Sequence, residues 1–89
     1  MKFTLNKEKS DVVFNVSECQ IDKHCRATII EDKARNTFWV YVRKEVYEWK
    51  DYLWYMEISN NKVTNIKECK QVAEKMIDIV NGYKPPLPN

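Results

Sequence analysis

Three cysteines and the single histidine are the side chains of this sequence that best suit metal binding: Cys19, His24, Cys25 and Cys69. Structural zinc sites usually contain ligand pairs spaced as C-x₂₋₄-C. Here five residues separate the first two cysteines, and the histidine directly precedes the second. Adjacent residues of a strand point to opposite faces, so these two neighbours would rarely share one metal ion. We therefore expect free thiols, with no metal site and no cofactor.

A nucleophilic Cys–His pair is the second chemistry that these residues could support. Such a pair also needs a group that orients the histidine and a cleft that holds the substrate. The sequence marks neither around His24. Two patterns, Glu31-Asp32-Lys33 and Glu48-Trp49-Lys50, match the E-x-K spacing of metal-dependent nucleases, but glutamate and lysine are so frequent here that chance explains them. We therefore expect no enzyme and no catalytic residue.

Chain length and glycine content exclude several enzyme classes. The chain has 89 residues and one glycine, Gly82, whereas phosphate-binding loops need several glycines close together. P-loop NTPases and Rossmann dinucleotide enzymes are thereby excluded. A domain of this size buries only about 60–65% of the surface that its unfolded chain exposes, which leaves little room for an enclosed pocket. The size favours a binding surface over an enclosed active site.

Charge is nearly balanced, with 15 basic and 13 acidic side chains and a formal net charge of +2. Both signs are spread evenly along the chain, and no basic arm of the kind that binds nucleic acid stands out. The N-terminal residues carry charge from Lys2 onward, and no apolar run approaches the length of about 20 residues that spans a membrane. We expect a cytoplasmic protein without membrane association, in which the cysteines stay reduced.

Apolar periodicity predicts the elements that position these residues. Alternation with a period of two indicates strands around residues 12–16, 37–43 and 53–59, with weaker strands at 26–31 and 2–6. Polar and turn-forming residues separate these segments. The period then changes to that of a helix for the remainder of the chain.

The C-terminal helix is the clearest element and runs from about Asn65 to Asn81. Its apolar stripe consists of Ile66, Cys69, Val72, Ala73, Met76, Ile77 and Val80. Asn65 and Glu68 have the spacing of a capping box at its start. Gly82 is expected to end the helix in the left-handed conformation, and the prolines at positions 85 and 86 prevent the helix from resuming.

Strands followed by one helix predict an α+β fold, in which the helix packs on one face of an antiparallel sheet of four to five strands. We expect one domain over residues 1–83 and an extended proline-rich tail over residues 84–89. Residues 44–51 fit either a hairpin arm or a loop. The sheet face under the helix should carry Phe38, Val40, Val42, Trp54, Met56 and Ile58. The opposite face should carry Trp39, Tyr41, Arg43, Leu53, Tyr55 and Glu57.

Aromatic residues concentrate on this second face and in the adjoining segment. Eight of the 11 aromatic residues lie between positions 38 and 55, which is more than one small core holds. Tyrosine, tryptophan and arginine are enriched at interface hot spots, and a large exposed aromatic patch usually marks an interaction site. We therefore expect non-catalytic binding of a partner through Trp39, Tyr41, Arg43, Tyr47, Trp49 and Tyr55.

Several alternatives stay open. Aromatic cross-strand pairs stabilise a sheet by themselves, and the N-terminal strand or the tail could cover this face. A homodimer could form through it. The tail, Lys84-Pro85-Pro86-Leu87-Pro88, also has the spacing of a polyproline II ligand.

Nucleic acid is the main alternative partner. Single-stranded or duplex nucleic acid could stack its bases on the aromatic rings, although six acidic residues between positions 31 and 60 oppose phosphates. The strand–strand–helix order of residues 37–81 is loosely similar to the small three-stranded DNA-binding domains of phage integrases. Val63-Thr64-Asn65-Ile66 lacks the glycine–aromatic turn that those domains share, and no family is assigned.

Size and composition suggest what kind of binding protein this is. A small chain rich in lysine, asparagine and isoleucine is typical of accessory proteins of phages and other mobile elements. Many such proteins inhibit a host enzyme or a defence complex by occluding it. We therefore expect a protein partner, and an inhibitor or adaptor that acts by occlusion.

Overall fold

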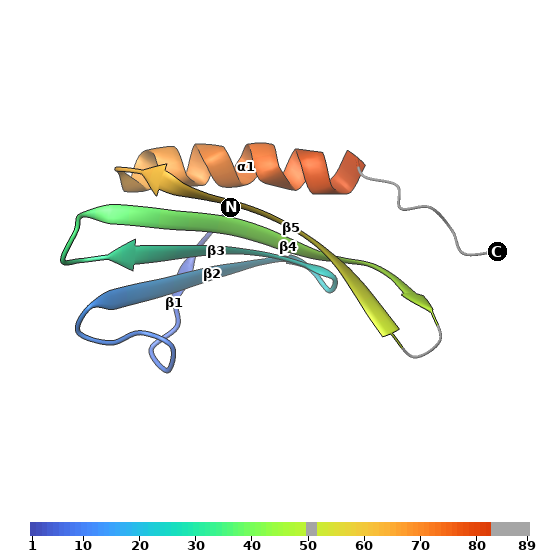
Figure 1. Cartoon of the computed structure of the whole chain (residues 1–89), viewed down its shortest axis with the longest axis horizontal. Helices are drawn as coiled ribbons and strands as arrows, with labels where there is room; N and C mark the ends of the chain where they lie inside the picture. Colours follow the sequence, from blue (N-terminus) through green and yellow to red (C-terminus); the bar gives the residue numbers. More distant parts are fainter. Residues whose placement is uncertain (50–51, 83–89) are drawn as a thin grey trace.

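The computed structural model describes residues 1–49 and 52–82, with the side chains of residues 1–45 and 55–82 (Figure 1). In this part of the chain, five strands form one antiparallel sheet, and neighbours in sequence are neighbours in the sheet. The strands are β1 (Thr4–Leu5), β2 (Phe14–Asp22), β3 (Cys25–Asp32), β4 (Thr37–Trp49) and β5 (Tyr52–Val63). Helix α1 (Ile66–Gly82) follows and lies along one face of the sheet. The predicted α+β fold is confirmed.

Short turns with local side-chain caps make this simple strand order possible. Between β2 and β3, the Asp22 carboxylate accepts a hydrogen bond from the backbone N–H of His24 at 2.7 Å. Between β3 and β4, the Asp32 carboxylate accepts hydrogen bonds from the two backbone N–H groups of residues 34 and 35, at 3.1 and 3.2 Å. Asn36 closes this second turn with a φ of 52°, a left-handed conformation that asparagine tolerates better than most residues.

The β4–β5 hairpin is long and irregular at both ends. The two strands stay paired from Phe38 opposite Val63 to Trp49 opposite Tyr52, with a register shift near each end. Residues 44–49 therefore form the predicted hairpin arm with β5, and the alternative prediction of a loop is wrong for them. Residues 50 and 51 lie outside the described part of the chain. Figure 1 shows this arm extending past the other strands.

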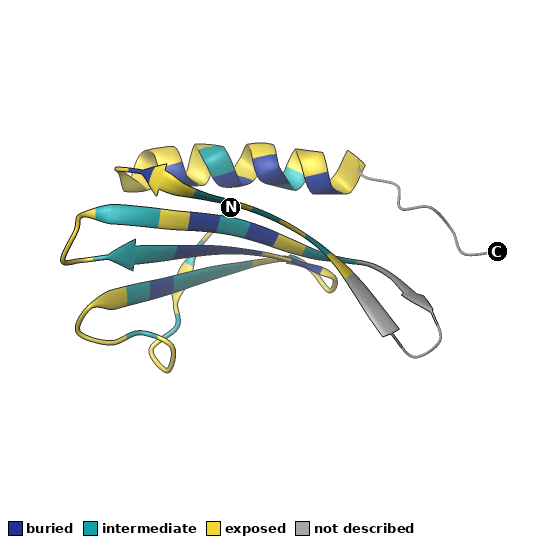
Figure 2. Ribbon diagram, in the orientation of Figure 1, coloured by how far each residue is buried: buried dark blue, intermediate teal, exposed yellow. Residues whose placement is uncertain are grey.

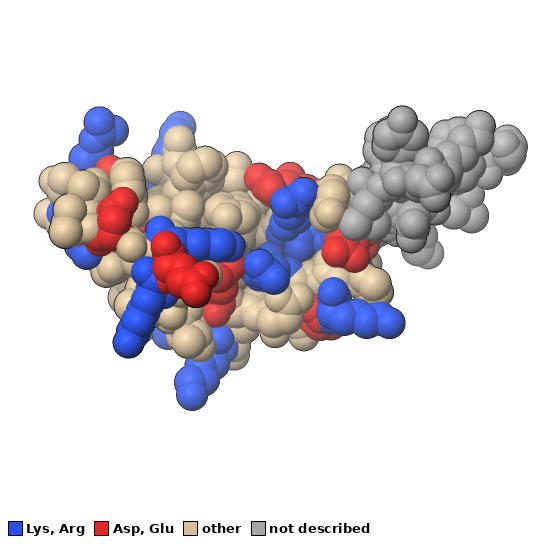
Figure 3. All heavy atoms as spheres, turned by 90° about the horizontal axis from the view of Figure 1, so that it is seen from below, with Lys and Arg blue, Asp and Glu red and all other residues tan. Residues whose placement is uncertain are grey.

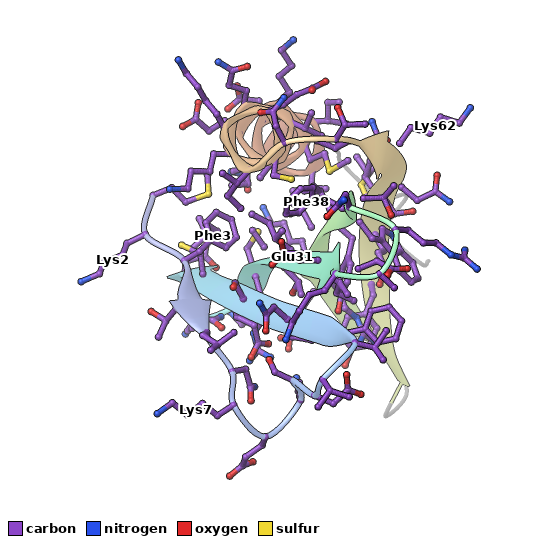
Figure 4. All side chains as sticks on the ribbon, turned by 90° about the vertical axis from the view of Figure 1, so that its left-hand side faces the viewer. Lys2, Phe3, Lys7, Glu31, Phe38 and Lys62 are labelled. Carbon is purple, nitrogen blue, oxygen red and sulfur yellow. The ribbon has the colours of Figure 1, made fainter. Side chains whose placement is uncertain are left out.

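The core lies between α1 and the three strands β3, β4 and β5 (Figure 2). Its buried residues are Cys25, Ala27, Ile29, Val40, Val42, Val63, Cys69, Ala73, Met76 and Val80. The four helical members recur at spacings of four, three and four residues, which keeps them on one side of the helix. Phe3 and Phe38 pack against the margins of this core between sheet and helix (Figure 4).

The two ends of α1 differ in how well the sequence predicts them. The Asn65 side chain accepts a hydrogen bond from the backbone N–H of Glu68 at 2.8 Å, which confirms the cap. Gly82, in contrast, is the last helical residue and has no positive φ, so its predicted left-handed conformation is wrong. Ile66 is 51% exposed and does not belong to the buried stripe, which begins at Cys69.

Strand β2 begins later and ends later than its apolar alternation predicts. Val12 is 91% exposed and precedes the strand. The Asp11 carboxylate accepts hydrogen bonds from the backbone N–H groups of Val13 and Phe14, both at 2.8 Å, and so forms a turn before the strand. Within residues 1–49 and 52–82, no helix combines the length and apolar character needed to cross a membrane.

Candidate functional site

The face of the sheet opposite α1 is the candidate site, and we call it the open face. Directly paired residues of neighbouring strands share a face, so the register identifies its members. Trp39 pairs with Ile30, which pairs with Val16. Arg43 pairs with Arg26 on β3 and with Glu57 on β5. The open face therefore spans strands β2 to β5.

The structure brings four of the six predicted partner-binding residues together on this face. Trp39 and Tyr55 are 46% and 44% exposed, Arg43 is exposed, and Tyr41 is half-buried between them. Glu57 is exposed on the same face. On the helix side, the predicted members Phe38, Val40, Val42, Met56 and Ile58 are all part of the core or packed against it.

The remaining predicted residues lie in the hairpin arm. The backbone of Tyr47 pairs with that of Trp54, and the backbone of Trp49 pairs with that of Tyr52. The side chains of these residues, and that of Leu53, lie outside the described part of the structure. Their predicted role in binding stays a prediction.

One half of the open face is apolar. This apolar half consists of Phe14, Val16, Ile30 and Trp39, on three adjacent strands. Phe14 and Trp39 keep about two fifths or more of their surface exposed, and the Trp39 ring lies 5.9 Å from the Tyr41 ring at a tilt of 58°. Sequence analysis missed Phe14, Val16 and Ile30 as members, because the faces of β2 and β3 could not be assigned without their register to β4.

The other half is a charged hollow of about 280 Å³, with the buried Thr28 among its walls. Tyr41 and Tyr55 line it together with charged side chains of both signs. The basic members are Lys9, Lys23, Arg26 and Arg43, and the acidic members are Glu18 and Glu45. Figure 3, which views the molecule from the side opposite α1, shows lysine, arginine and carboxylate side chains interspersed over this face.

Glu18 organises one wall of the hollow. Its carboxylate accepts hydrogen bonds from the Asn6 side chain at 2.6 Å, from Lys9 at 3.3 Å and from Arg26 at 3.2 Å. The hydrogen bond from Asn6, assisted by the two cations, holds the pKa of Glu18 below its usual value of 4.5. Glu18 is therefore ionised at neutral pH and neutralises part of the positive charge on this wall.

Arg43 occupies the opposite wall and has a different environment. Its guanidinium carbon lies 3.7 Å from the centroid of the Tyr55 ring, a cation–π contact. In the described residues, no carboxylate forms an ion pair with Arg43, including its register neighbour Glu57. Arg43 is also paired directly with Arg26, and like charges at such positions repel each other.

The histidine and cysteines do not assemble into a reactive group. His24 is exposed and its Nδ1 lies 2.9 Å from a Glu45 oxygen, whereas Cys25 is fully buried in the core. Burial raises the pKa of the Cys25 thiol, and burial raises that of Cys69 to about 11. Among residues with described side chains, no three histidine, cysteine, aspartate or glutamate groups are arranged to hold a metal ion.

The E-x-K pattern at residues 31–33 is also dispersed by the structure. Glu31 accepts a hydrogen bond from the Asn15 side chain at 3.0 Å, Asp32 holds the following turn, and the Lys33 ammonium donates to the backbone carbonyl of Asp11 at 3.1 Å. The three side chains serve separate local contacts. The second pattern, at residues 48–50, lies outside the described side chains.

The N-terminal segment borders the open face and does not cover its aromatic residues. Strand β1 pairs with the outer edge of β2, and the turn that follows it lies beside Glu18, Gln20 and Arg26, with Asn6 and Lys9 hydrogen-bonded to Glu18. Trp39 and Tyr55 remain nearly half exposed with this segment in place. The predicted tail, residues 84–89, lies outside the described residues. No protein-family model, curated protein or solved structure matches this chain.

Proposed function

We propose that this chain is a non-catalytic protein-binding module that holds its partner on the open face. The observation that carries the proposal is the unequal use of the two sheet faces. One face is buried by α1, while the other keeps the large side chains of Phe14, Trp39 and Tyr55 between 40% and 46% exposed beside a charged hollow. An apolar area rimmed by charge has the anatomy of a protein interface.

A protein partner fits the charges of this face better than nucleic acid does. Nucleic-acid binding depends on many phosphate contacts, which favour a continuous basic surface. Here Glu18, Glu45 and Glu57 lie among the basic residues of the same face and would repel a phosphate backbone. The apolar half offers an area that a partner's side chains would desolvate. Stacking of bases on Trp39 and Tyr55 remains the alternative that the experiment must test.

Composition supports an inhibitor as the type of binding module. A small chain rich in lysine, asparagine and isoleucine is typical of phage and mobile-element accessory proteins, which often occlude a host enzyme or defence complex. A small rigid face that binds tightly is sufficient for such occlusion. The exposed aromatic and arginine side chains are the residue types that dominate the binding energy of protein interfaces.

Affinity capture from the native host, followed by calorimetry on the identified partner, tests the proposal. Trp39→Ala should weaken binding by at least ten-fold, because truncation of a central aromatic side chain typically costs about 2 kcal/mol or more. Circular dichroism must show that the variant stays folded. Ile79→Ala on the solvent side of α1 is the matched control, since Ile79 is 55% exposed and remote from the open face.

Two further measurements separate the alternatives. Fluorescence anisotropy with single-stranded and duplex oligonucleotides, at low and moderate salt, should show no Trp39-dependent binding. Sedimentation should show the same mass for the wild type and Trp39→Ala. Salt-sensitive oligonucleotide binding that depends on Trp39 would favour nucleic acid, and dissociation of a wild-type dimer by Trp39→Ala would favour self-association.

A further inference from the structure

The charged hollow contains two arginines at directly opposed positions of neighbouring strands, an arrangement that costs energy in the unbound protein. Arg26 and Arg43 are direct cross-strand partners, and their Cβ atoms are expected to lie about 5 Å apart. Like charges on directly opposed residues of neighbouring strands repel each other. The side chains diverge: Arg26 donates to Gln20 and Glu18 on β2, while Arg43 lies over Tyr55 on β5. An anion between the two would remove this repulsion.

The hydrogen-bonding capacity of Arg43 is unused in the described part of the structure. A guanidinium has five N–H donors arranged for bidentate contact with a carboxylate or phosphate. Arg26 uses its donors on Gln20 and Glu18 at 2.9 and 3.2 Å, whereas Arg43, among the side chains that the structure describes, has its stacking contact with Tyr55 and no hydrogen bond. Stacking on the Tyr55 ring occupies one flat side of the guanidinium and leaves the N–H donors at its edge available for a ligand.

The charge distribution in the hollow favours binding of a single anionic group over binding of a phosphate backbone. Glu18 is paired with both Lys9 and Arg26 and so offsets one of these two positive charges, and Glu45 is hydrogen-bonded to His24. This leaves the positive charge of Arg43, with Lys23 on the rim, unmatched among residues with described side chains. A single carboxylate can reach Arg43 in the hollow. A phosphate backbone would extend over the neighbouring carboxylates.

We infer that the hollow is the receptor for an aspartate or glutamate side chain of the partner protein, which Arg43 binds while Trp39 and its apolar neighbours hold an adjacent apolar side chain. The inference rests on the proposed function and specifies the chemistry of the partner. Trp39 and Arg43 are four residues apart on one strand, so the two anchoring points lie about 13 Å apart. An extended partner segment matches this distance when its acidic residue is four positions from its apolar residue.

Titration of ¹⁵N-labelled protein with sodium acetate, at constant ionic strength against sodium chloride, tests the carboxylate site without an identified partner. Acetate should cause saturable shifts confined to Thr28, Tyr41, Arg43 and Tyr55, including the Arg43 side-chain N–H. Arg43→Gln should weaken this binding at least ten-fold. Arg35→Gln removes the same charge from the exposed β3–β4 turn and should leave the affinity for acetate unchanged. Shifts that are linear, dispersed or equal in Arg43→Gln would overturn the inference.

A peptide pair tests the predicted spacing and the choice of anion. Acetyl-Trp-Ser-Thr-Ser-Glu-amide should bind at least ten-fold more tightly than the same peptide ending in glutamine, and this difference should vanish in Arg43→Gln. Equal affinities, or no binding of either peptide, contradict the inference. Stronger Arg43-dependent binding of oligothymidylate than of the acidic peptide would assign the hollow to nucleic acid instead.

These results are separable from the test of the proposed function. Partner binding that depends on Trp39, together with no acetate site, would overturn only the carboxylate assignment. An acetate site at Arg43, with no partner bound through Trp39, would instead contradict the proposed docking face.

Discussion

The guanidinium carbon of Arg43 lies 3.7 Å from the centroid of the Tyr55 ring, on the sheet face that α1 leaves open. Residues 43 and 55 are diagonal neighbours on the two long strands of the β4–β5 hairpin, since Arg43 pairs with Glu57 and Tyr55 pairs with Glu45. The contact fixes the arginine at the edge of the hollow, opposite the ion-paired Arg26. Among the residues with described side chains, Arg43 is thus positioned by an aromatic ring and not by a carboxylate.

Replacement of Arg43 by glutamine should leave the stability of the free protein nearly unchanged. The lost cation–π contact costs about 0.5–1 kcal/mol at an exposed site. The relieved repulsion with Arg26 returns about 0.2–1 kcal/mol. Urea unfolding should therefore give a free energy of unfolding within about 0.5 kcal/mol of the wild type, with Tyr55→Phe, which keeps the ring, as control. A loss above about 2 kcal/mol would make Arg43 a structural residue.

Two isoleucines measure how much of the stability comes from the layer between sheet and helix. Ile29 is 2% exposed in β3, and Ile79 is 55% exposed on α1. Ile29→Ala should lower the free energy of unfolding by about 2–5 kcal/mol, because the truncation leaves a cavity in the core. Ile79→Ala should change it by less than about 0.5 kcal/mol. If chemical denaturation showed similar losses of unfolding free energy for Ile29→Ala and Ile79→Ala, the core would not lie between the sheet and this side of the helix.

The pH dependence of stability should contain a measurable contribution from Glu18. Its pKa is lower in the folded protein than the usual 4.5, because Asn6, Lys9 and Arg26 stabilise the carboxylate. The stabilisation is therefore complete above about pH 5 and disappears as the pH falls from 4.5 through the folded-state pKa. Glu18→Gln should cost about 1 kcal/mol at neutral pH and nothing at a pH below that folded-state value.

Urea unfolding of both proteins across this pH range isolates the effect. Asp11 also has a lowered pKa, because the backbone N–H groups of Phe14 and Val13 donate to its carboxylate. The wild type and Glu18→Gln share that contribution, so it cancels in their difference. A difference that does not change with pH would show that Glu18 acts through packing or neutral hydrogen bonds.

The fold was predictable from sequence where one pattern dominates. The helical spacing of Cys69, Ala73, Met76 and Val80, and the alternation of Val40 and Val42, each identify an element and its buried side. Strand β2 was harder, because its apolar residues change face: Phe14 and Val16 lie on the open face, whereas Cys19 and Ile21 pack against the core on the other face. Pairing with β3 makes the second half of β2 a strand, and pairing is not visible in local periodicity.

The candidate site was predictable only where local alternation of apolar and polar residues identifies the face of a strand. Trp39, Tyr41, Arg43 and Tyr55 belong to the strongly alternating hairpin, which fixes their common face. The like-charge pair of Arg26 and Arg43, in contrast, exists only through the β3–β4 register, because 17 positions separate the two residues in sequence. The charged hollow likewise combines residues from Lys9 to Tyr55.

Differential alkylation of the three cysteines tests the core and the expectation that the thiols are unreactive together. Cys25 and Cys69 are fully buried, and burial raises the pKa of both thiols, in Cys69 to about 11. Only the thiolate reacts with iodoacetamide, so both should be protected in the native protein at about pH 8. Cys19 is half-buried on β2 and should be modified first. Mass spectrometry of peptides from native and urea-unfolded protein measures each site, and rapid native modification of Cys69 would contradict the packing of α1 on the sheet.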